Sequence, residues 1–132
     1  MRSAAAYAET LTMTLSQERA FEELYLRLAR RTGEAMAGSV DDDWPAINVL
    51  LERCVALLGY MSGLIDVSRS YETAAAILSL NRFAIGALIR AKSERDQKHL
   101  EGLPQLFVSL AEIFAVMDLQ AIAPSTTIRA GQ

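Results

Sequence analysis

The most constraining feature of this sequence is a stretch from Trp44 to Lys92 in which apolar residues recur at helical spacing on more than one face. The stretch divides at residues 66–70, which predicts two helices joined by a short loop. In the first helix, one row at steps of three and four predicts the core face: Ile47, Leu51, Cys54, Leu58, Met61 and Ile65. A second row has Leu50, Leu57 and Leu64, with the small residues Ala56, Gly59 and Gly63 beside it.

The second helix of this stretch repeats the excess of apolar residues. One row contains Ala74, Ile77, Ala84 and Leu88, and another contains Tyr71, Leu78, Ile85 and Ile89. One apolar row is enough for a helix at the surface of a bundle. Two rows indicate either that the helix is central or that one of its faces is kept for a partner.

Length, charge and cysteine content narrow the class of protein. A chain of 132 residues is long enough for one domain with its own core. The net charge of -3, with arginines spread among carboxylates, argues against nucleic acid as a partner. The longest apolar run, around residues 54–65, is shorter than the roughly 18 residues that span a bilayer, and the N-terminus has no apolar signal segment. We therefore expect a cytoplasmic protein without membrane insertion, and the lone Cys54 predicts no intrachain disulfide.

Two more helices flank the central pair. Ser16 is a suitable N-cap for a helix whose core stripe is Phe21, Leu24, Tyr25, Leu28, Thr32 and Ala35. Gly102 and Pro104 open a last helix with a broad apolar stripe up to Met117. These patterns predict an all-α, antiparallel four-helix bundle at residues 16–118, with a flexible N-terminal arm at residues 1–15 and a disordered C-terminal tail at residues 119–132. The charged segment 90–99 is expected to leave the core and fray into solvent.

Catalytic chemistry finds little support in the sequence. The only histidine, His99, cannot supply a di-iron site, a zinc site with Cys54, or a Ser/His/Asp triad. We therefore expect no enzymatic activity, no cofactor and no metal. The pattern from His99 to Gly102 leaves a histidine phosphotransfer domain as an alternative, although the charge of Glu101 and the helix break at Gly102 argue against it. The other interpretation of His99 is an exposed loop residue.

The order of features along the chain is similar to that of a known family. The residues that carry the likeness are Ala6-Tyr7, Thr12–Leu15, Glu23-Leu24-Tyr25, Ile47–Asp66, Glu72 and Ile77–Ala91. On these residues the chain resembles the FliS family of flagellar export chaperones over about residues 6–118. The family often has tyrosines in the third helix where this chain has Asn81 and Phe83.

The resemblance implies a cytoplasmic helical bundle that binds the C-terminal region of flagellin, prevents its premature polymerisation and assists flagellar type III export. The client folds as amphipathic helices in apolar grooves. We expect the partner-binding residues to be Tyr7, Leu50, Leu57, Gly59, Gly63, Leu64, Leu80, Ala84 and Ile85. In the free protein the arm is expected to cover part of the groove with Tyr7. The small residues have a second interpretation, in which they only tighten packing within the bundle.

Several alternatives remain open at the level of sequence. A helical interaction or regulatory module for another flagellar component would use the same groove for a different client. The export machinery is a further candidate partner. Helices with two apolar rows also suit a homodimer, because a second copy would cover the same surface as a client.

Overall fold

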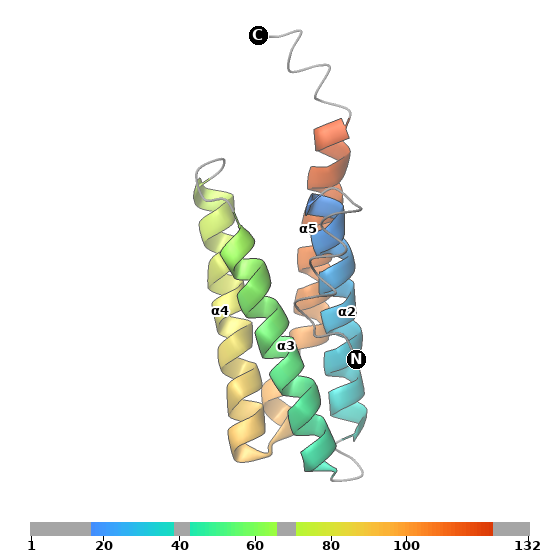
Figure 1. Cartoon of the computed structure of the whole chain (residues 1–132), viewed down its shortest axis with the longest axis vertical. Coiled ribbons are helices and arrows are strands. Elements are labelled where there is room, and N and C mark those ends of the chain that lie inside the picture. The colour runs from blue at the N-terminus through green and yellow to red at the C-terminus, as the bar shows by residue number, and fades with distance from the viewer. Residues whose placement is uncertain (1–16, 39–42, 66–70, 123–132) are drawn as a thin grey trace, which may run out of the picture.

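The computed structural model describes residues 17–38, 43–65 and 71–122 (Figure 1). In the described part of the chain, four long helices and one short 3₁₀ helix follow one another: α2 (Gln17–Gly38), α3 (Trp44–Leu64), α4 (Tyr71–Glu94), η2 (Gln97–Leu100) and α5 (Leu103–Ile122). The predicted all-α fold is confirmed, and α5 continues beyond residue 118, where the apolar pattern weakens.

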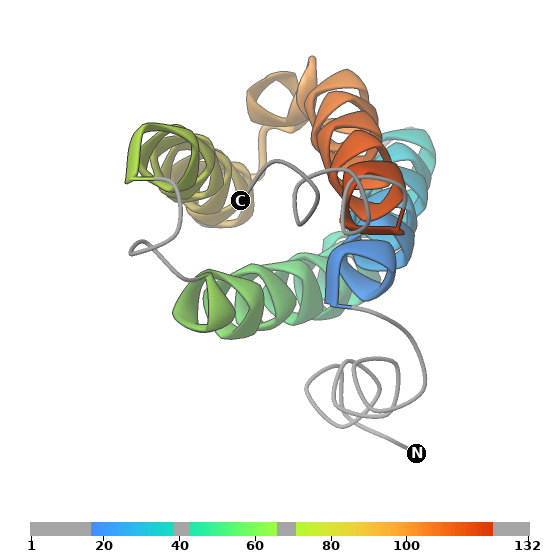
Figure 2. The ribbon, with the colours of Figure 1, turned by 90° about the horizontal axis from the view of Figure 1, so that it is seen from above.

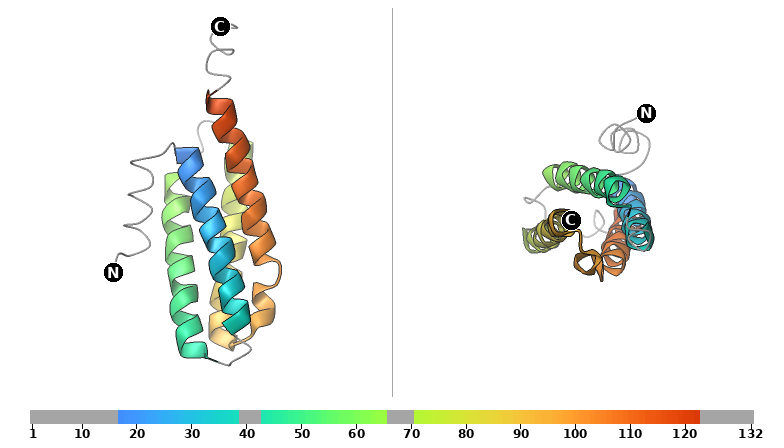
Figure 3. Two further views of the ribbon diagram at one scale, coloured as in Figure 1. Left: turned by 90° about the vertical axis from the view of Figure 1, so that its right-hand side faces the viewer. Right: turned by 90° about the horizontal axis from the view of Figure 1, so that it is seen from below.

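The helices alternate in direction, so that each runs antiparallel to its neighbour in the chain (Figure 1). Seen along the bundle, they form an arc in the order α4, α3, α2 and α5 (Figure 2). The pairs α2/α5 and α3/α4 make the closest associations between helices, and η2 packs against the end of α4. Figure 3 shows α3, α2 and α5 side by side from another direction. This arrangement is the antiparallel bundle that the short loops predict.

The core lies where the predicted stripes face one another. The whole predicted stripe of the first helix is buried in α2, as are Ile47, Leu51, Cys54, Leu58 and Met61 in α3. In α4 the buried row contains the predicted Ala74, Ile77, Ala84 and Leu88. Apolar side chains at helical spacing thus form the core because burial removes their surface from water.

Aromatic rings join α2 to α5. The ring centroids of Phe21 and Phe114 lie 5.1 Å apart, and the Tyr25 ring lies 5.6 Å from Phe114 and 6.3 Å from Phe107. These separations are in the range for favourable aromatic pairs. The two helices associate closely and contain buried alanines: Ala20 and Ala35 on α2, and Ala111 on α5.

A buried polar network connects three helices. The hydroxyl of Tyr25 on α2 donates a hydrogen bond of 2.7 Å to Oδ1 of Asn81 on α4. The Asn81 amide in turn donates to Oγ of Ser62 on α3 at 3.0 Å. Burial raises the pKa of Tyr25 to about 12. Since a buried polar group without a partner is unfavourable, the network specifies how α2, α3 and α4 align.

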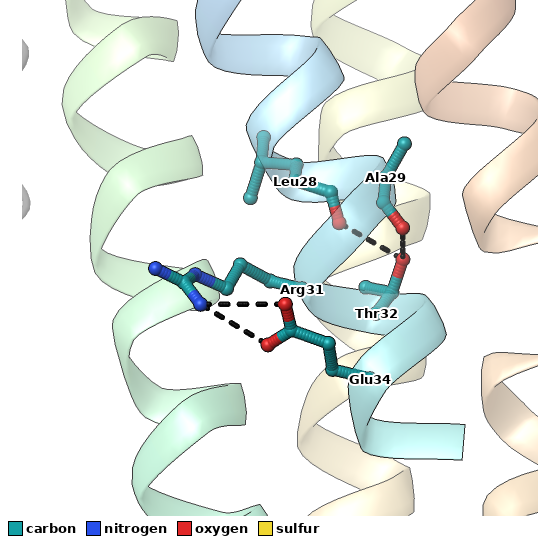
Figure 4. Close-up of polar contacts among 5 residues, drawn as sticks. All are labelled: Leu28, Ala29, Arg31, Thr32 and Glu34. Carbon is teal, nitrogen blue, oxygen red and sulfur yellow. Dashed lines mark hydrogen bonds and ion pairs between the residues drawn. The ribbon is translucent and has the colours of Figure 1, made fainter. Parts of the chain in front are cut away.

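Local contacts within α2 match its sequence. The Thr32 hydroxyl is buried and donates to the carbonyl oxygens of Leu28 at 2.9 Å and Ala29 at 3.1 Å (Figure 4). This arrangement explains how a hydroxyl is accommodated in the core stripe. On the exposed side, Arg31 forms an ion pair with Glu34 at 3.1 Å (Figure 4).

The connection from α4 to α5 differs from the sequence prediction. The charged segment does not fray: α4 ends at Glu94, the chain turns at Arg95 with φ 51°, and η2 follows. The physical reason is an apolar anchor, because Leu100 at the end of η2 is fully buried. His99 therefore lies in a packed 3₁₀ helix rather than an exposed loop, and its side chain is only 19% exposed. Gly102, with φ 83°, then starts α5 as expected.

Three helical stretches in the described residues are long and apolar enough to cross a membrane when judged by length and composition alone. They are Trp44–Leu64, Tyr71–Glu94 and Gln97–Met117. The uninterrupted apolar runs of the sequence are shorter than these helices. Each helical stretch nevertheless contains 18 consecutive residues of high mean hydropathy with at most two charged side chains. The absence of membrane insertion stays a prediction.

Candidate functional site

The outer side of the α3/α4 pair brings together several of the predicted partner-binding residues. An ion pair between Glu52 on α3 and Lys92 on α4 crosses this side. Residues seven apart in a helix lie on the same side, so Gly59 follows Glu52 and Ile85 precedes Lys92 along it. Because the two helices are antiparallel, Gly59 and Ile85 lie opposite each other, about two helical turns from the ion pair.

We call this side the α3–α4 face and define it by Gly59, Gly63, Leu78, Ile85 and Ile89. Leu78 continues the row of Ile85 and Lys92 by another seven residues. Leu78 and Ile85 are half-buried, and Ile89 is 49% exposed. The second apolar row of α4 is thus left partly uncovered by the bundle, as expected of a helix that keeps a face for a partner.

Both glycines of the α3–α4 face are exposed, and neither is required by packing. A Cβ atom built on Gly59 or Gly63 meets nothing within 4 Å. A glycine within a helix is destabilising by about 1 kcal/mol relative to alanine. The interpretation that these glycines only tighten packing within the bundle therefore does not fit, since the bundle has space for a side chain at both positions.

Other predicted residues lie elsewhere on the bundle. Leu57 on α3 and Ala84 on α4 are buried in the core of the free protein, with 3% and 0% exposure. Leu50 and Leu64 are half-buried beside that core. Because they precede and follow Gly59 by nine and five residues, they point to roughly the opposite side of α3. Leu80, five residues before Ile85, likewise lies on another side of α4 and is 36% exposed.

One continuous groove therefore does not unite all the predicted residues in this structure. Tyr7 lies outside the described residues, so its placement over the groove stays a prediction. The predicted partner-binding residues did not include three large exposed apolar residues of α4: Tyr71 at 72%, Phe83 at 59% and Ile89 at 49% exposure. Tyr71 and Ile89 belonged to a predicted apolar row. Phe83 fell outside both rows, and its apolar character at a position off the core stripe was the available signal.

Thiol chemistry is not available at Cys54. The side chain lies in the core, and burial raises the pKa of its thiol to about 12, although the charges of Arg31 and Arg27 act in the opposite direction. A thiol that stays protonated is a poor nucleophile and a poor metal ligand. Cys54 therefore acts as a small core residue, as the stripe predicts.

A group of potential metal ligands occurs where none was predicted. At the end of α4, ligand atoms of Glu94, Asp96 and His99 all lie within 4.8 Å of one another. His99 Nε2 is 2.9 Å from Oε1 of Glu94. Sequence reasoning missed the group because it treated the segment as frayed, and the spacing Glu-x-Asp-x-x-His was the available signal. The adjacent carboxylate also argues against phosphotransfer, since it repels a phosphoryl group at Nε2.

Comparisons with known proteins give one result for the whole chain. The family model described as "Flagellar protein FliS" matches residues 1–121. Searches of curated proteins and of solved structures find no match. The matched range takes in all four long helices almost to the end of α5. With that coverage, and with the helical bundle that the resemblance implies, this chain belongs to the FliS family of flagellar chaperones.

Proposed function

We propose that this protein is an export chaperone that binds the C-terminal region of flagellin through the α3–α4 face. FliS proteins are chaperones rather than enzymes, and their clients are of the flagellin type. The observation that carries the proposal is the pair of exposed glycines on α3. Gly59 and Gly63 leave backbone open to a partner at positions where the bundle itself has room for side chains.

The two glycines suit a helical client. A helix packs closely against another where small residues allow the backbones to approach, and steps of four place Gly59 and Gly63 on one line along α3. Ile85 and Ile89 on α4 provide an apolar wall beside that line. An amphipathic client helix would bury its apolar side against this surface, which is the helix-in-groove mode of recognition.

The energetic source of binding is apolar burial. The C-terminal region of flagellin is taken to be disordered before it binds, so part of the interaction free energy is used to order it. The partly exposed side chains of α4 supply the apolar area whose burial offsets this ordering cost. Phe83 and Leu80 add apolar area on another side of the helix. A client that wraps from one side of α4 to the other would reach both sets of residues.

Binding of this kind explains the proposed cellular role. A flagellin segment that is folded against the chaperone cannot pair with other flagellin molecules, so polymerisation in the cytoplasm is prevented. The same complex delivers unassembled flagellin to the type III export apparatus. Tyr7 in the N-terminal arm is proposed to cover part of the binding surface until the client displaces it.

Calorimetric titration of the purified chain with the C-terminal region of its cognate flagellin tests the proposal. We expect a one-to-one complex, and we expect Gly59→Leu with Gly63→Leu to weaken it at least tenfold, because two branched side chains would keep the client away from α3. Gly33→Leu on α2 is the matched control, since a Cβ there also meets nothing within 4 Å. Absence of binding by the unaltered chain would contradict the proposal, whereas a self-associated chain would indicate the homodimer.

A further inference from the structure

The junction between α4 and η2 places the only histidine of the chain between two carboxylates. We propose that Glu94, Asp96 and His99 form a binding site for a divalent transition-metal ion such as Zn²⁺. The proposal is independent of client binding, because the junction follows the C-terminal end of α4, at the lower end of the bundle in Figure 1. Gly59 and Gly63 lie near the C-terminal end of α3, which runs antiparallel to α4, and so belong to the opposite end. Neutral imidazole with carboxylates is a donor set that suits zinc.

The donor atoms have nearly the separation that an ion needs. Two ligands bound to zinc at about 2.1 Å, at angles between 90° and the tetrahedral value, lie roughly 3.0 to 3.4 Å apart. Nε2 of His99 and Oε1 of Glu94 are 2.9 Å apart, and the donor atoms of all three residues lie within 4.8 Å of one another. A shift of a few tenths of an ångström in the exposed Glu94 side chain would admit an ion between Glu94 and His99. Donor atoms up to 4.8 Å apart would have to approach by up to roughly 1.4 Å for all three residues to bind the same ion.

The backbone holds these side chains in place without an ion. The left-handed conformation of Arg95 turns the chain between Glu94 and Asp96. The Lys98 N–H donates a hydrogen bond of 3.0 Å to Oδ1 of Asp96, and Leu100 fixes η2 in the core. The backbone of the junction is therefore ordered before an ion binds, which lowers the entropy cost of assembling the three ligands, and water would complete the coordination.

The ammonium group of Lys98 competes with an ion. Its Nζ lies 3.8 Å from Oδ2 of Asp96, so it occupies part of the negative field of the site. Lys98 is 70% exposed and has a flexible side chain, which allows it to move away. This competition gives the proposal a distinctive consequence: removing the Lys98 charge should strengthen metal binding.

Titration of the untagged full-length chain with ZnCl₂, followed by calorimetry, tests the site. We expect one Zn²⁺ per chain with a submillimolar Kd, and His99→Ala and Glu94→Gln should each weaken binding by about tenfold or more. Lys98→Met should strengthen it. Lys92→Met is the matched control, because Lys92 pairs with Glu52 on the α3–α4 face and should leave zinc affinity unchanged.

A spectroscopic measurement separates loss of ligands from loss of folding. The ¹⁵N signal of His99 Nε2 should shift on addition of ZnCl₂ to the unaltered chain, and the melting temperature of that chain should rise. In His99→Ala, zinc should leave the melting temperature unchanged while circular dichroism still reports a folded bundle. Zinc affinity within twofold of the unaltered chain in both His99→Ala and Glu94→Gln, or an unchanged Nε2 signal, would overturn the site.

Discussion

Replacing the exposed glycines of α3 by alanine should change stability and client binding in opposite directions. Gly59 and Gly63 lie within a helix, are exposed, and have open space where a Cβ would stand. A packing role predicts that alanine destabilises the bundle. A role as the floor of a client site predicts that alanine stabilises the free bundle and weakens the complex.

The expected magnitude follows from helix propensity. Alanine is favoured over glycine by about 0.8–1.0 kcal/mol at an interior helical position, and no contact is made or lost here. Gly59 is an interior position, whereas Gly63 lies in the last turn of α3, where the preference is weaker. The double variant should therefore gain about 1–2 kcal/mol in the free energy of unfolding. For a chain of this size that corresponds to a rise of roughly 3–10 °C in melting temperature. In the complex, two added methyl groups move a client helix outward and should weaken binding several-fold.

Two assays on the same protein samples decide the matter. Thermal and urea unfolding of the free chain give the stability, and calorimetric titration with the flagellin C-terminal region gives the affinity. Gly33→Ala on α2 is the control that should raise stability by the same mechanism and leave affinity unchanged. If the double variant is destabilised, or if it is stabilised and binds the client as tightly as the unaltered chain, Gly59 and Gly63 are not the floor of a client site.

Three further predictions concern the core and the arm. Tyr25→Phe leaves Asn81 Oδ1 without its donor and should lower the free energy of unfolding by about 1–3 kcal/mol, as measured by urea denaturation. Burial in the folded chain raises the pKa values of Cys54 and Tyr25 to about 12. The unfolded chain therefore loses these protons at lower pH, and the free energy of unfolding should fall as pH rises above about 9. In Cys54→Ala only Tyr25 contributes, so the fall should begin at about pH 10. Deleting residues 1–13 should increase binding of an apolar dye and change client affinity; no change in either would exclude the proposed covering role of Tyr7.

Much of the fold was predictable because the spacing of apolar residues along the chain determines which face is buried in a helix with one apolar stripe. The residues of α2 from Phe21 to Ala35 that recur at steps of three and four are all buried as expected. The start of α3 at Trp44 and the start of α5 after Gly102 follow from proline and glycine, whose backbone preferences act within one or two residues. Such features require no knowledge of which helix packs on which.

The candidate site was only partly predictable from the sequence. In a helix with two apolar rows, the rotation of the helix about its axis decides which row faces the core, and local spacing does not fix that rotation. Helical spacing places Gly59 and Ile85 on one face, because each lies seven residues from a member of the Glu52–Lys92 ion pair. Leu57 and Ala84 had the same apolar or small character, yet they lie inside the bundle. The sequence offered two apolar rows on each central helix without indicating which row would be covered.

Spacing of apolar residues, punctuated by glycine and proline, thus determined the number of long helices, their core stripes and the family likeness, since each depends on residues close together in the chain. Tertiary packing decided which second row stays open, that Asn81 joins Tyr25 to Ser62, and that the segment before α5 folds back to gather Glu94, Asp96 and His99. The physical reason is that these features depend on the relative rotation and approach of whole helices, which many distant side chains fix together.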